Sequence, residues 1–550
     1  MAVPWVTAGQ PDEQAGRRRK WWGWGYEDGD LTPGERDQIV APLAAHFGRE
    51  LTPVVPPPVS GLALATPRVK VPAALADITR SDPWTRASHS FGKAYRDVVR
   101  ALKGELRHPP DHVVFPRDEQ EVAAVLDWCT QVNAAAIPYG GGSSVVGGVE
   151  PDVGDGYAAA VTIDMSAAGR VLEVEPVSRA ARIQAGALGP AIEGQLRAAG
   201  GNLTLRHFPQ SFEVSTIGGW VATRSGGHFA TRLTHIDDVV EGLRVVTPSG
   251  VVATRRLPAT GAGPSPDRLF LGSEGALGIV TEVWVRLHER PTFQTAEAVL
   301  FPTFSSAVVA ARGIAQADLF PSNCRLLDPM EALISGVGDG SAAILLVGFE
   351  SADHPVAPWC DRAVEICADH GGVARLSPGG GGDGQEDGDE TRRWRSAFLR
   401  APYVRDALVT AGILCETFET AVTWDRLDAL DEAVRAAVAG VLDPVAFGAA
   451  VVSCRLTHVY PDGAAPYYTV LAPARPGSEV AVWDDVKAAA SEAILAAGGT
   501  ITHHHAVGRV HSPWYDRQVP RLFRQSLADV KQVLDPGWIL NPGVLVRRSG

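Results

Sequence analysis

The sequence predicts an α+β fold, and the distribution of its strand and helix patterns carries that prediction. Runs of β-branched residues dominate 109–290, where helical patterns are few. Helical and strand patterns alternate over 291–490, and the terminal segments 1–108 and 491–550 hold short helical patterns. Strands gathered in one stretch, rather than alternating with helices throughout, favour α+β over a doubly wound sheet. We therefore expect a strand-rich domain at 109–290, a second α+β domain at 291–490 and helical terminal segments.

The N-terminal segment combines proline-rich stretches with a helical pattern in "TPGERDQIVAPLAAHFG". Thr32 is placed to cap that helix, with Pro33 in its first turn. Upstream, "RRRKWWGWG" sets three tryptophans beside four basic residues. That combination suits contact with anionic lipid headgroups. The favoured alternative is that Trp21, Trp22 and Trp24 pack onto the protein while the basic side chains are solvated.

The strand-rich region opens with a β-α-β unit. "DHVVFP" predicts a short strand, "RDEQEVAAVLDWCTQVN" a helix capped by Asp118, and "AAAIPYGGGSSVVGG" a strand that runs into a glycine loop. Further strands are expected in "YAAAVTIDM" and "VLEVEPVSRAARIQAGA". A hairpin is expected in "LRVVTPSGVVATR", turning at Pro248, Ser249 and Gly250. One helical segment, "LGPAIEGQLRAAGG", lies among them.

The region from 291 onward alternates helical patterns such as "FSSAVVAARGIAQADL" and "WDRLDALDEAVRAAVAGVL" with strand patterns such as "AAILLVGFE". An insert, "SPGGGGDGQEDGD" at 377–389, is rich in Gly and Asp and predicts a mobile surface loop. The tail holds "GGTITHHHAVG", a helical pattern in "YDRQVPRLFRQSLADVKQVL" and the closing stretch "LDPGWILNPGVLV".

Composition excludes several classes of protein. The net charge of −13 argues against nucleic-acid binding, which needs a basic surface, so an anionic substrate would require clustered Arg, Lys or His. The six cysteines are scattered without a CxxC pair, which is typical of reduced thiols in a cytoplasmic protein. No apolar run approaches the ~18 residues that a transmembrane helix needs.

Three loops rich in Gly, Ser and Thr lie in the strand-rich region. The first, "PYGGGSSVVGG" at 138–148, is not a Rossmann fingerprint, because Val145 stands where the third glycine belongs, and no lysine follows as in a P-loop. Its amides suit a pyrophosphate, although a plain tight turn explains the loop equally well. The loops "STIGGWVATRSGG" at 215–227 and "GSEGALGIVTEV" at 272–283 favour a long, phosphate-bearing cofactor that is contacted at several points.

These loops carry a family resemblance. Residues 109–290 resemble the FAD-binding domain of the vanillyl-alcohol-oxidase-type flavoproteins, the PCMH-type fold, and "LDPGWILNPG" at 534–543 resembles that family's closing motif near the flavin. Eight segments within 17–545 are similar, in order, to the alkyldihydroxyacetonephosphate synthase (alkylglycerone-phosphate synthase) branch. They are "WWGWGYEDGD", "LRHFPQSFEVSTIGGWVATRSGG", "FLGSEGALGIVTE", "CRLLD", "YVRDALV", "CETFETAVTWDRLDAL", "CRLTHVYPDGAAPYY" and "GGTITHHHAVG".

The resemblance implies FAD as the cofactor. Non-covalent binding is expected, because the loop at 138–148 holds no histidine for attachment. In "RHFPQS", His207 matches a histidine beside the cofactor, and in "CRLLD", Arg325 matches an arginine near the flavin. The other residues expected to bind FAD are Pro138, Tyr139, Gly140, Gly141, Gly142, Ser143, Ser144, Gln210, Ser215, Thr216, Thr223, Arg224, Ser225, Gly226, Glu274, Gly275, Ala276, Leu277, Gly278, Ile279 and Val280.

Three consecutive histidines, His503, His504 and His505, stand in "GGTITHHHAVG". On a strand, His503 and His505 would share one face and His504 would take the other. No cluster of further ligands at metal spacing accompanies them, so we expect no metal site, while core or surface positions stay open. The resemblance implies an active-site cluster beside the flavin, because the D-lactate and glycolate branches usually carry an acidic-His-Gly pattern there instead.

Two further residues match catalytic groups of the family. Tyr467, in "DGAAPYY", falls at its catalytic tyrosine, and Arg405, in "YVRD", at an arginine suited to a carboxylate or phosphate. A phenol with a pKa of about 10 is a poor base unless neighbouring His or Arg lowers that pKa. Purely structural roles stay open, as does a one-residue slip to Tyr468. The family segment usually reads Cys-Ile-Tyr, where this chain has Ala465 and Pro466 before the tyrosine.

The resemblance implies an enzyme that replaces the acyl chain of acyl-dihydroxyacetone phosphate with a fatty alcohol, forming the bond of ether lipids without net oxidation. The flavin would act through a covalent adduct at its N5. Tyr467 would move the C1 proton with help from the three histidines, and Arg405 would orient the carboxylate or phosphate.

Two alternatives to this function remain. The runner-up is an FAD-linked oxidoreductase that acts on a 2-hydroxy acid or another alcohol, and the third is a flavin-bearing lipid-binding or redox-sensing protein. The expected partners are small-molecule lipids and a second copy in a homodimer, without nucleic acid. The expected location is the cytoplasm, with peripheral contact to a membrane.

Overall fold

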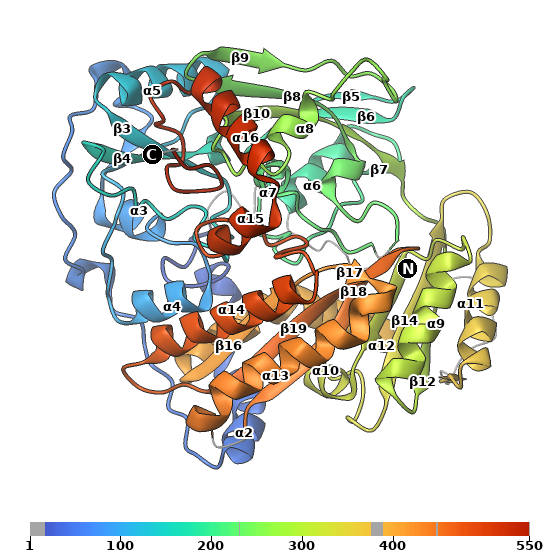
Figure 1. Cartoon of the computed structure of the whole chain (residues 1–550). Coiled ribbons are helices and arrows are strands. Elements are labelled where there is room, and N and C mark those ends of the chain that lie inside the picture. The colour runs from blue at the N-terminus through green and yellow to red at the C-terminus, as the bar shows by residue number, and fades with distance from the viewer. Residues whose placement is uncertain (1–16, 230, 376–388, 447–448, 549–550) are drawn as a thin grey trace.

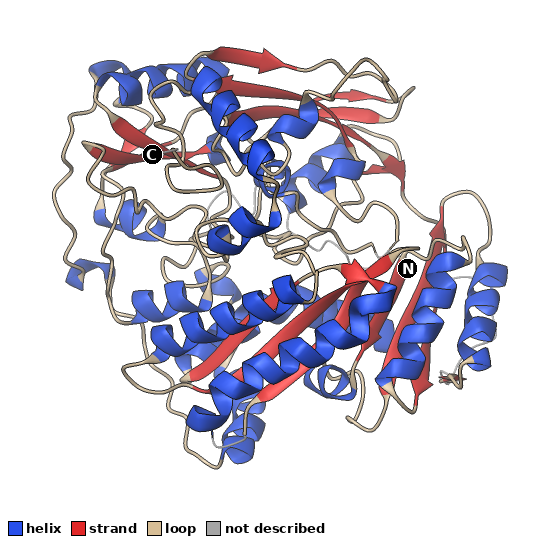
Figure 2. Cartoon of the chain, in the orientation of Figure 1, coloured by secondary structure: helices blue, strands red, loops and turns tan. Residues whose placement is uncertain are grey.

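The computed structural model describes residues 17–229, 231–375, 389–446 and 449–548. Two smaller sheets and a short two-stranded pair lie in one half of the molecule, and one large sheet lies in the other, with helices packed around them (Figures 1 and 2). This arrangement is the α+β fold that the sequence predicts.

The first sheet has the strand order β1-β2-β4-β3. Its strands are β1 (Thr79–Arg80), β2 (His112–Val114), β3 (Ala134–Tyr139) and β4 (Ala159–Asp164). Helix α5 (Glu119–Gln131) connects β2 to β3, and both strands run parallel to β4 between them. Asp118 caps α5 by accepting a hydrogen bond from the Glu121 amide, as predicted, and such a cap is worth about 1 kcal/mol.

The second sheet is antiparallel, with the order β5-β6-β10-β8-β9. Its strands are β5 (Val171–Glu175), β6 (Ala180–Gln184), β8 (Val240–Thr247), β9 (Gly250–Ala253) and β10 (Ile279–Arg286). The predicted hairpin is confirmed, because β8 pairs with β9 and Thr247 stands opposite Gly250. This half also holds β7 (Leu203–Thr204), β11 (His288–Glu289), α6 (Gly189–Ala198), α7 (Ile217–Thr223) and α8 (Asp267–Phe270).

The large sheet is antiparallel, with the order β15-β12-β14-β13-β18-β19-β16, and β17 pairs with β19. Its strands are β12 (Phe293–Phe301), β13 (Asn323–Leu327), β14 (Ala343–Ser351), β15 (Val373–Ala374), β16 (Ile413–Glu419), β17 (Val422–Thr423), β18 (Val451–Val459) and β19 (Gly463–Pro473). Helices α9 (Phe304–Gln316), α11 (Ala357–Asp369) and α13 (Leu427–Ala446) pack against this sheet on one face (Figure 1).

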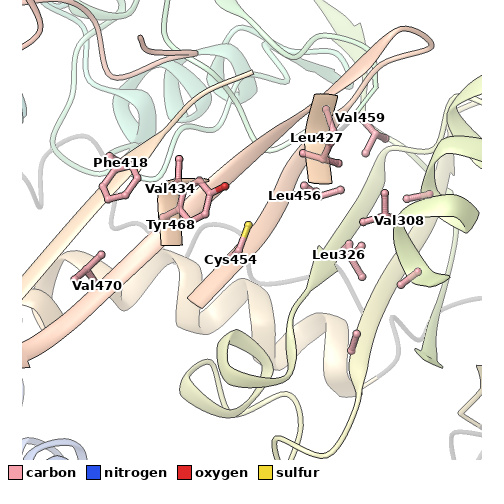
Figure 3. Close-up of a cluster of buried hydrophobic side chains, with 14 of the residues drawn as sticks. Val308, Leu326, Phe418, Leu427, Val434, Cys454, Leu456, Val459, Tyr468 and Val470 are labelled. Atoms are coloured by element: carbon pink, nitrogen blue, oxygen red, sulfur yellow. The ribbon is translucent and has the colours of Figure 1, made fainter. Parts of the chain in front are cut away.

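Side chains alternate between the two faces of the large sheet along its central strands. Phe418, Cys454, Tyr468 and Val470 lie on the helical side, where Val434 of α13 packs among them (Figure 3). The rings of Phe418 and Tyr468 stack there with centroids 5.2 Å apart. The residues between them along each strand face the other half of the molecule, and this period of two decides which side chains reach the site described below.

The remaining helices are α2 (Pro33–Phe47), α3 (Pro83–Ser88), α4 (Tyr95–Leu102), α10 (Pro329–Ile334), α12 (Asp389–Thr410), α14 (Glu479–Ala496), α15 (Ser512–Gln518) and α16 (Arg521–Leu534). Thr32 caps α2 through a reciprocal capping box with Glu35, and Pro33 lies in the first turn, both as predicted. Helix α14 crosses residue 490, so the domain boundaries stay predictions. The insert at 377–389 lies outside the described residues except for Asp389.

All six cysteines are buried and free, in agreement with the expectation of reduced thiols. In the described part of the chain, no helix is both long enough and apolar enough to cross a membrane.

Candidate active site

A cavity of about 420 Å³ lies between the two halves. One wall comes from the three predicted loops, 138–148, 215–227 and 272–283, which we call the FAD cradle, and the opposite wall is the inner face of the large sheet. The predicted residues that line the cavity are Pro138, Tyr139, Gly140, Gly141, Gly142, Ser143, Ser144, Gln210, Ser215, Thr216, Thr223, Ser225, Gly226, Glu274, Gly275, Gly278, Ile279, Val280, Arg325, Arg405, Tyr467, His504 and His505.

The first loop of the cradle presents a row of backbone amides. Within the described structure, the amides of Gly141, Gly142, Ser143 and Ser144 donate to no protein acceptor. Glycine is needed here, because a Cβ on Gly141 would lie 1.9 Å from the Val214 carbonyl oxygen and Gly142 has a φ of +65°. Successive amides in such a loop bind phosphate oxygens. This donor set fits the pyrophosphate of FAD.

The C-terminal tail is hydrogen-bonded to two of the three loops. Asn541 donates from Nδ2 to the carbonyl oxygens of Gly148 and Glu274, at 3.0 and 2.7 Å. The Glu274 carboxylate accepts hydrogen bonds from the amides of Val507 and Gly508, at 2.9 and 2.8 Å. Burial raises the pKa of Glu274 to about 7, although these two amides act in the opposite direction. The loop conformation therefore depends on residues far away in the sequence.

An N-terminal arginine reaches the same cradle. Arg19 donates to the carbonyl oxygens of Gly141 and Val214, at 2.7 and 3.1 Å, and so ties the first loop to the residue that precedes the second. Trp24 lines the cavity next to them. The sequence alone assigned neither residue to the cofactor site.

The basic-aromatic stretch therefore faces inward. Trp21 and Trp24 are 5% and 6% exposed, and the buried Lys20 pairs with Asp406 at 3.1 Å. Packing of the tryptophans onto the protein is confirmed for these two. The expectation of solvated basic side chains is wrong for Lys20, which is buried, and for Arg19, which is hydrogen-bonded. Lipid contact by this stretch stays a prediction, and among its basic residues Arg18 is the one whose side chain is exposed.

Tyr467 lies at the centre of the sheet-side wall. On β19 it stands opposite Glu419 of β16 and Arg455 of β18. The guanidinium carbon of Arg455 lies 3.8 Å from the centre of the Tyr467 ring, and the ring of His504 lies nearly parallel to it at 6.1 Å. Tyr468, the residue that a one-residue slip would select, points to the opposite face and packs in the core.

Burial raises the pKa of Tyr467, and the charges of Arg455 and Arg405 oppose this shift without reversing it. The prediction that neighbours lower this pKa is therefore wrong in its net direction. Arg455 is the larger opposing charge, and on its other side it forms an ion pair with the buried Glu331 of α10. The phenol consequently stays protonated at neutral pH.

The three histidines lie in a loop, not on a strand. The Glu419 carboxylate accepts hydrogen bonds from the backbone amides of His503, His504 and His505, the last two at 3.1 and 2.8 Å. It also accepts one from the Thr502 hydroxyl at 2.6 Å. The predicted alternation of the histidines is therefore wrong. One carboxylate folds the loop so that His504 and His505 both reach the cavity.

Burial keeps these histidines neutral. It lowers the pKa of His504 to about 3 and that of His505 to about 4, and it holds the pKa values of His503 and His458 well below their usual range. Ring nitrogens of His458, His503 and His504 lie within 4.8 Å of one another, as do ligand atoms of Glu419, His504 and His505. The fold thus gathers groups that the sequence spacing did not reveal, and the expected absence of a metal stays a prediction.

Both predicted arginines line the cavity. Arg405, on α12, donates to Glu416 at 3.3 Å, and its Nε has no partner among the described residues. Arg325, on β13, donates to the His228 carbonyl oxygen at 2.7 Å. The guanidinium of Arg405 is therefore anchored on one side and borders the cavity with the rest of its fork, which is the geometry that a phosphate or carboxylate needs. Arg325 borders the cavity with both terminal nitrogens bonded to His228, so it supplies positive charge there.

Five predicted residues lie behind the lining instead of in it. They are His207, Arg224, Ala276, Leu277 and His503. The guanidinium of Arg224 pairs with Asp237 at 2.8 Å, and the ring of His207 packs against Trp220 with centroids 5.2 Å apart. Ala276 and Leu277 belong to the hydrophobic core of the second sheet. The buried side chains of His207, Ala276 and Leu277 therefore support the cradle from behind, whereas the Arg224 side chain is half exposed.

Several residues of the sheet-side wall were missed from the sequence. They are Thr417, Arg455, Thr457, His458 and Thr469. The threonines of β16 and β19 follow the alternation that places Tyr467 at the cavity. Thr457 and His458 are neighbours that both line it, because a β-bulge shifts the register between Leu456 and His458. The same bulge lies beside Pro466, which has no N–H to pair across the sheet.

Comparison with known proteins agrees with this geometry. The family model described as "FAD binding domain" matches residues 110–255, and that described as "FAD linked oxidases, C-terminal domain" matches 290–545. Alkyldihydroxyacetonephosphate synthase of Dictyostelium discoideum is 30% identical over 499 residues, which cover 86% of this chain and 79% of the relative. A solved alkyldihydroxyacetonephosphate synthase structure matches with a TM-score of 0.77 and 25% identity, over 95% of this chain and 98% of that one.

The fold extends to more distant flavoproteins. The structure of p-cresol methylhydroxylase with substrate bound matches with a TM-score of 0.65 at 15% identity, over 93% of this chain and 97% of that one. The cradle of free amides and the matching FAD families assign FAD as the cofactor, and the protein is a flavoenzyme with the PCMH-type fold. By its similarity along most of its length, the chain belongs to the alkyldihydroxyacetonephosphate synthase family.

Proposed function

We propose that this enzyme exchanges the acyl chain of an acyl-dihydroxyacetone phosphate for a fatty alcohol. The bond between C1 and the acyl oxygen breaks, a bond between C1 and the alcohol oxygen forms, and a carboxylate and one proton leave. No net oxidation occurs. The observation that carries the proposal is that Tyr467, Arg405 and Arg325 border the same cavity as the FAD cradle.

In this proposal Tyr467 moves the C1 proton. Its phenol is protonated, so it first passes its own proton to a neutral histidine of the cavity, and the resulting phenolate, which Arg455 at 3.8 Å stabilises, then takes the C1 proton. His504 and His505 are neutral and border the same cavity, so they are available as proton acceptors. When bound, FAD supplies an electrophilic ring system that divides one difficult displacement into two easier steps.

The remaining lining suits the two ends of such a substrate. The chain carries a net charge of −13, so a phosphate or carboxylate must be held by local positive charge, which Arg405 and Arg325 provide. Apolar lining from Val404, Leu408 and Leu471 suits a hydrocarbon chain.

An anaerobic absorbance titration tests this function. Acyl-dihydroxyacetone phosphate is added to the FAD-loaded protein, and we expect the flavin band to bleach and to return when a fatty alcohol is added without any electron acceptor. The proposal is wrong if this lipid has no effect while a D-2-hydroxy acid bleaches the flavin until oxygen or a dye is admitted. That outcome assigns the enzyme to the FAD-linked oxidoreductases instead.

We also propose peripheral contact with a membrane, at α10 instead of the N-terminal tryptophans. Ile334 lines the cavity and is 44% exposed, and Met330 and Leu333 on the same helix are 37% and 48% exposed. An apolar rim at the cavity suits a substrate that enters from a bilayer. Co-sedimentation with anionic vesicles tests this contact, which Leu333→Glu should weaken and Leu257→Glu, at a distant exposed site, should not.

Homodimer formation and a cytoplasmic location also remain proposals. The buried, free cysteines support a reducing compartment. Light scattering of the FAD-loaded protein tests the dimer, because one chain has a mass of 58.2 kDa and a dimer has twice that mass.

A further inference from the structure

The proposed exchange releases one proton per turnover, from the hydroxyl of the incoming alcohol. Resting on that function, we infer that His504, His503 and Tyr460 form a proton path that leads from the cavity to the protein surface. His504 borders the cavity, whereas His503 lies behind it and Tyr460 lies beyond His503. Each step of the path is a hydrogen bond between side chains.

The first link joins the two histidines. Nδ1 of His503 lies 2.9 Å from Nδ1 of His504, which is a hydrogen-bond distance. Two like nitrogens bond in this way only if one ring carries its proton there and the other does not. Burial keeps both rings neutral at physiological pH, so each has one donor and one acceptor nitrogen. A proton can therefore pass from His504 to His503.

The second link uses the other nitrogen of His503. Its Nε2 lies 2.7 Å from the hydroxyl of Tyr460, so an imidazole that takes a proton at Nδ1 can release one at Nε2. The Tyr460 hydroxyl donates onward to Thr234 Oγ1 at 3.4 Å. When a proton moves outward, Nε2 of His503 donates to the Tyr460 oxygen, and the Tyr460 hydroxyl donates to Thr234. The chain of polar atoms is continuous from the cavity to Tyr460.

The path ends at the surface. Tyr460 borders a second cavity of about 710 Å³, whose lining includes the exposed residues Asp425, Arg426 and Asp462. The carboxylate of Asp462 lies close enough to influence Tyr460 electrostatically, as does that of Asp238. Tyr460 is itself half-buried, and these two carboxylates favour a proton on its oxygen, so Tyr460 is the outer end of the inferred path.

The surrounding groups hold the path in place without joining it. The rings of His235 and His458 pack against His503 with centroids 4.5 and 4.9 Å away. Nε2 of His458 is engaged with the Gly227 carbonyl oxygen at 3.1 Å. The backbone amide of His503 is bonded to Glu419, which leaves both ring nitrogens for the path.

The test combines two breaks in the path with a control. Tyr460→Phe removes the exit hydroxyl, and His503→Ala removes the middle ring and leaves room for added imidazole. Tyr157→Phe is the matched control, because its hydroxyl bonds the Trp538 carbonyl oxygen and takes no part in the path. Thermal unfolding of the FAD-loaded variants confirms that each is folded.

Two readouts are measured on each protein. The first needs no substrate: exchange of histidine ring N–H groups with solvent, followed by NMR after ¹⁵N-histidine labelling, should be slower in Tyr460→Phe than in the wild type and the control. The second is ether formation, which should fall about 10²-fold in both path variants, the lower end of the value of a positioned proton-transfer group. Imidazole should restore His503→Ala but not Tyr460→Phe.

Unchanged exchange and unchanged turnover in both variants would overturn the path. The path would also be overturned if each wild-type chain bound one Zn²⁺ and His503→Ala bound none. A metal on the ring nitrogens of His503 and His504 would occupy the positions that the proton needs. If the wild type forms no ether but Tyr460→Phe slows ring exchange, the path stands and the proposed reaction fails. If the wild type forms ether and both path variants match it in turnover and ring exchange, the reaction stands and the path fails.

Discussion

Replacing Glu419 by Gln should unfold the histidine loop before the rest of the site. The carboxylate accepts hydrogen bonds from three backbone amides and the Thr502 hydroxyl, and a glutamine offers one oxygen and one NH₂ group in the same space. Whichever way the amide is turned, its NH₂ faces at least one donor. Losing one charged hydrogen bond and making the others neutral costs about 3–6 kcal/mol. Because the neutral glutamine no longer buries a charge, part of this cost is offset, and the expected net loss in the free energy of unfolding is about 3 kcal/mol.

Urea unfolding at pH 7 measures this loss. Glu419→Gln should unfold at lower urea than the wild type, and turnover should fall because His504 and His505 lose their backbone anchor. The matched control is Glu492→Gln, an exposed carboxylate paired with Arg517, whose loss should cost at most about 1 kcal/mol because solvent screens the pair. If Glu419→Gln has the same urea midpoint as the wild type and keeps its turnover, the carboxylate does not organise this loop.

Tyr467→Phe should lose turnover ~10²–10⁴-fold while it keeps FAD, whereas Tyr468→Phe on the opposite face should keep both, as turnover and flavin absorbance will show. Arg19→Ala should weaken FAD retention about 10-fold in a dialysis assay monitored by flavin fluorescence, since a charged hydrogen bond of about 1.5–3 kcal/mol holds the first loop. The pKa values of His504 and His505 in the folded protein lie below the unfolded value of about 6.5, so folding is not penalised by their protonation above that pH. As the pH falls from 6.5 to 5, the free energy of unfolding should decrease by about 2 kcal/mol for each histidine. Urea midpoints at pH 7, 6 and 5 check the last prediction, which constant midpoints would contradict.

Elements set by local patterns could be predicted from the sequence. The cap at Asp118, the capping box at Thr32 and the hairpin of β8 and β9 depend on residues within a few positions of one another, and all three are confirmed. The glycine loops were identifiable because only certain residue types allow such backbone conformations and close approaches.

The histidine loop and the surroundings of Tyr467 could not be predicted, because long-range contacts decide them. Glu419 is 84 residues from the His503 amide that it binds, and Arg455 is 124 residues from Glu331. The three consecutive histidines alone therefore do not reveal whether their backbone is an extended strand or a loop whose amides donate to one carboxylate. The period of two along β18 and β19 would have placed Arg455 on the side of Tyr467, but only once their register was known.

The same separation in sequence means that the FAD cradle does not fold on local information. The free amides of the first loop require the close contact of Gly141 with Val214, and Arg19 bonds both of these residues from the N-terminal segment. On the other side, Asn541 holds Gly148 and Glu274 from the tail. The tail also pairs with β3, because Ala136 exchanges backbone hydrogen bonds with Ile539 and Asn541, so both the edge of the first sheet and the geometry of the amides depend on it. Cofactor affinity is therefore a property of both chain ends as much as of the domain between them.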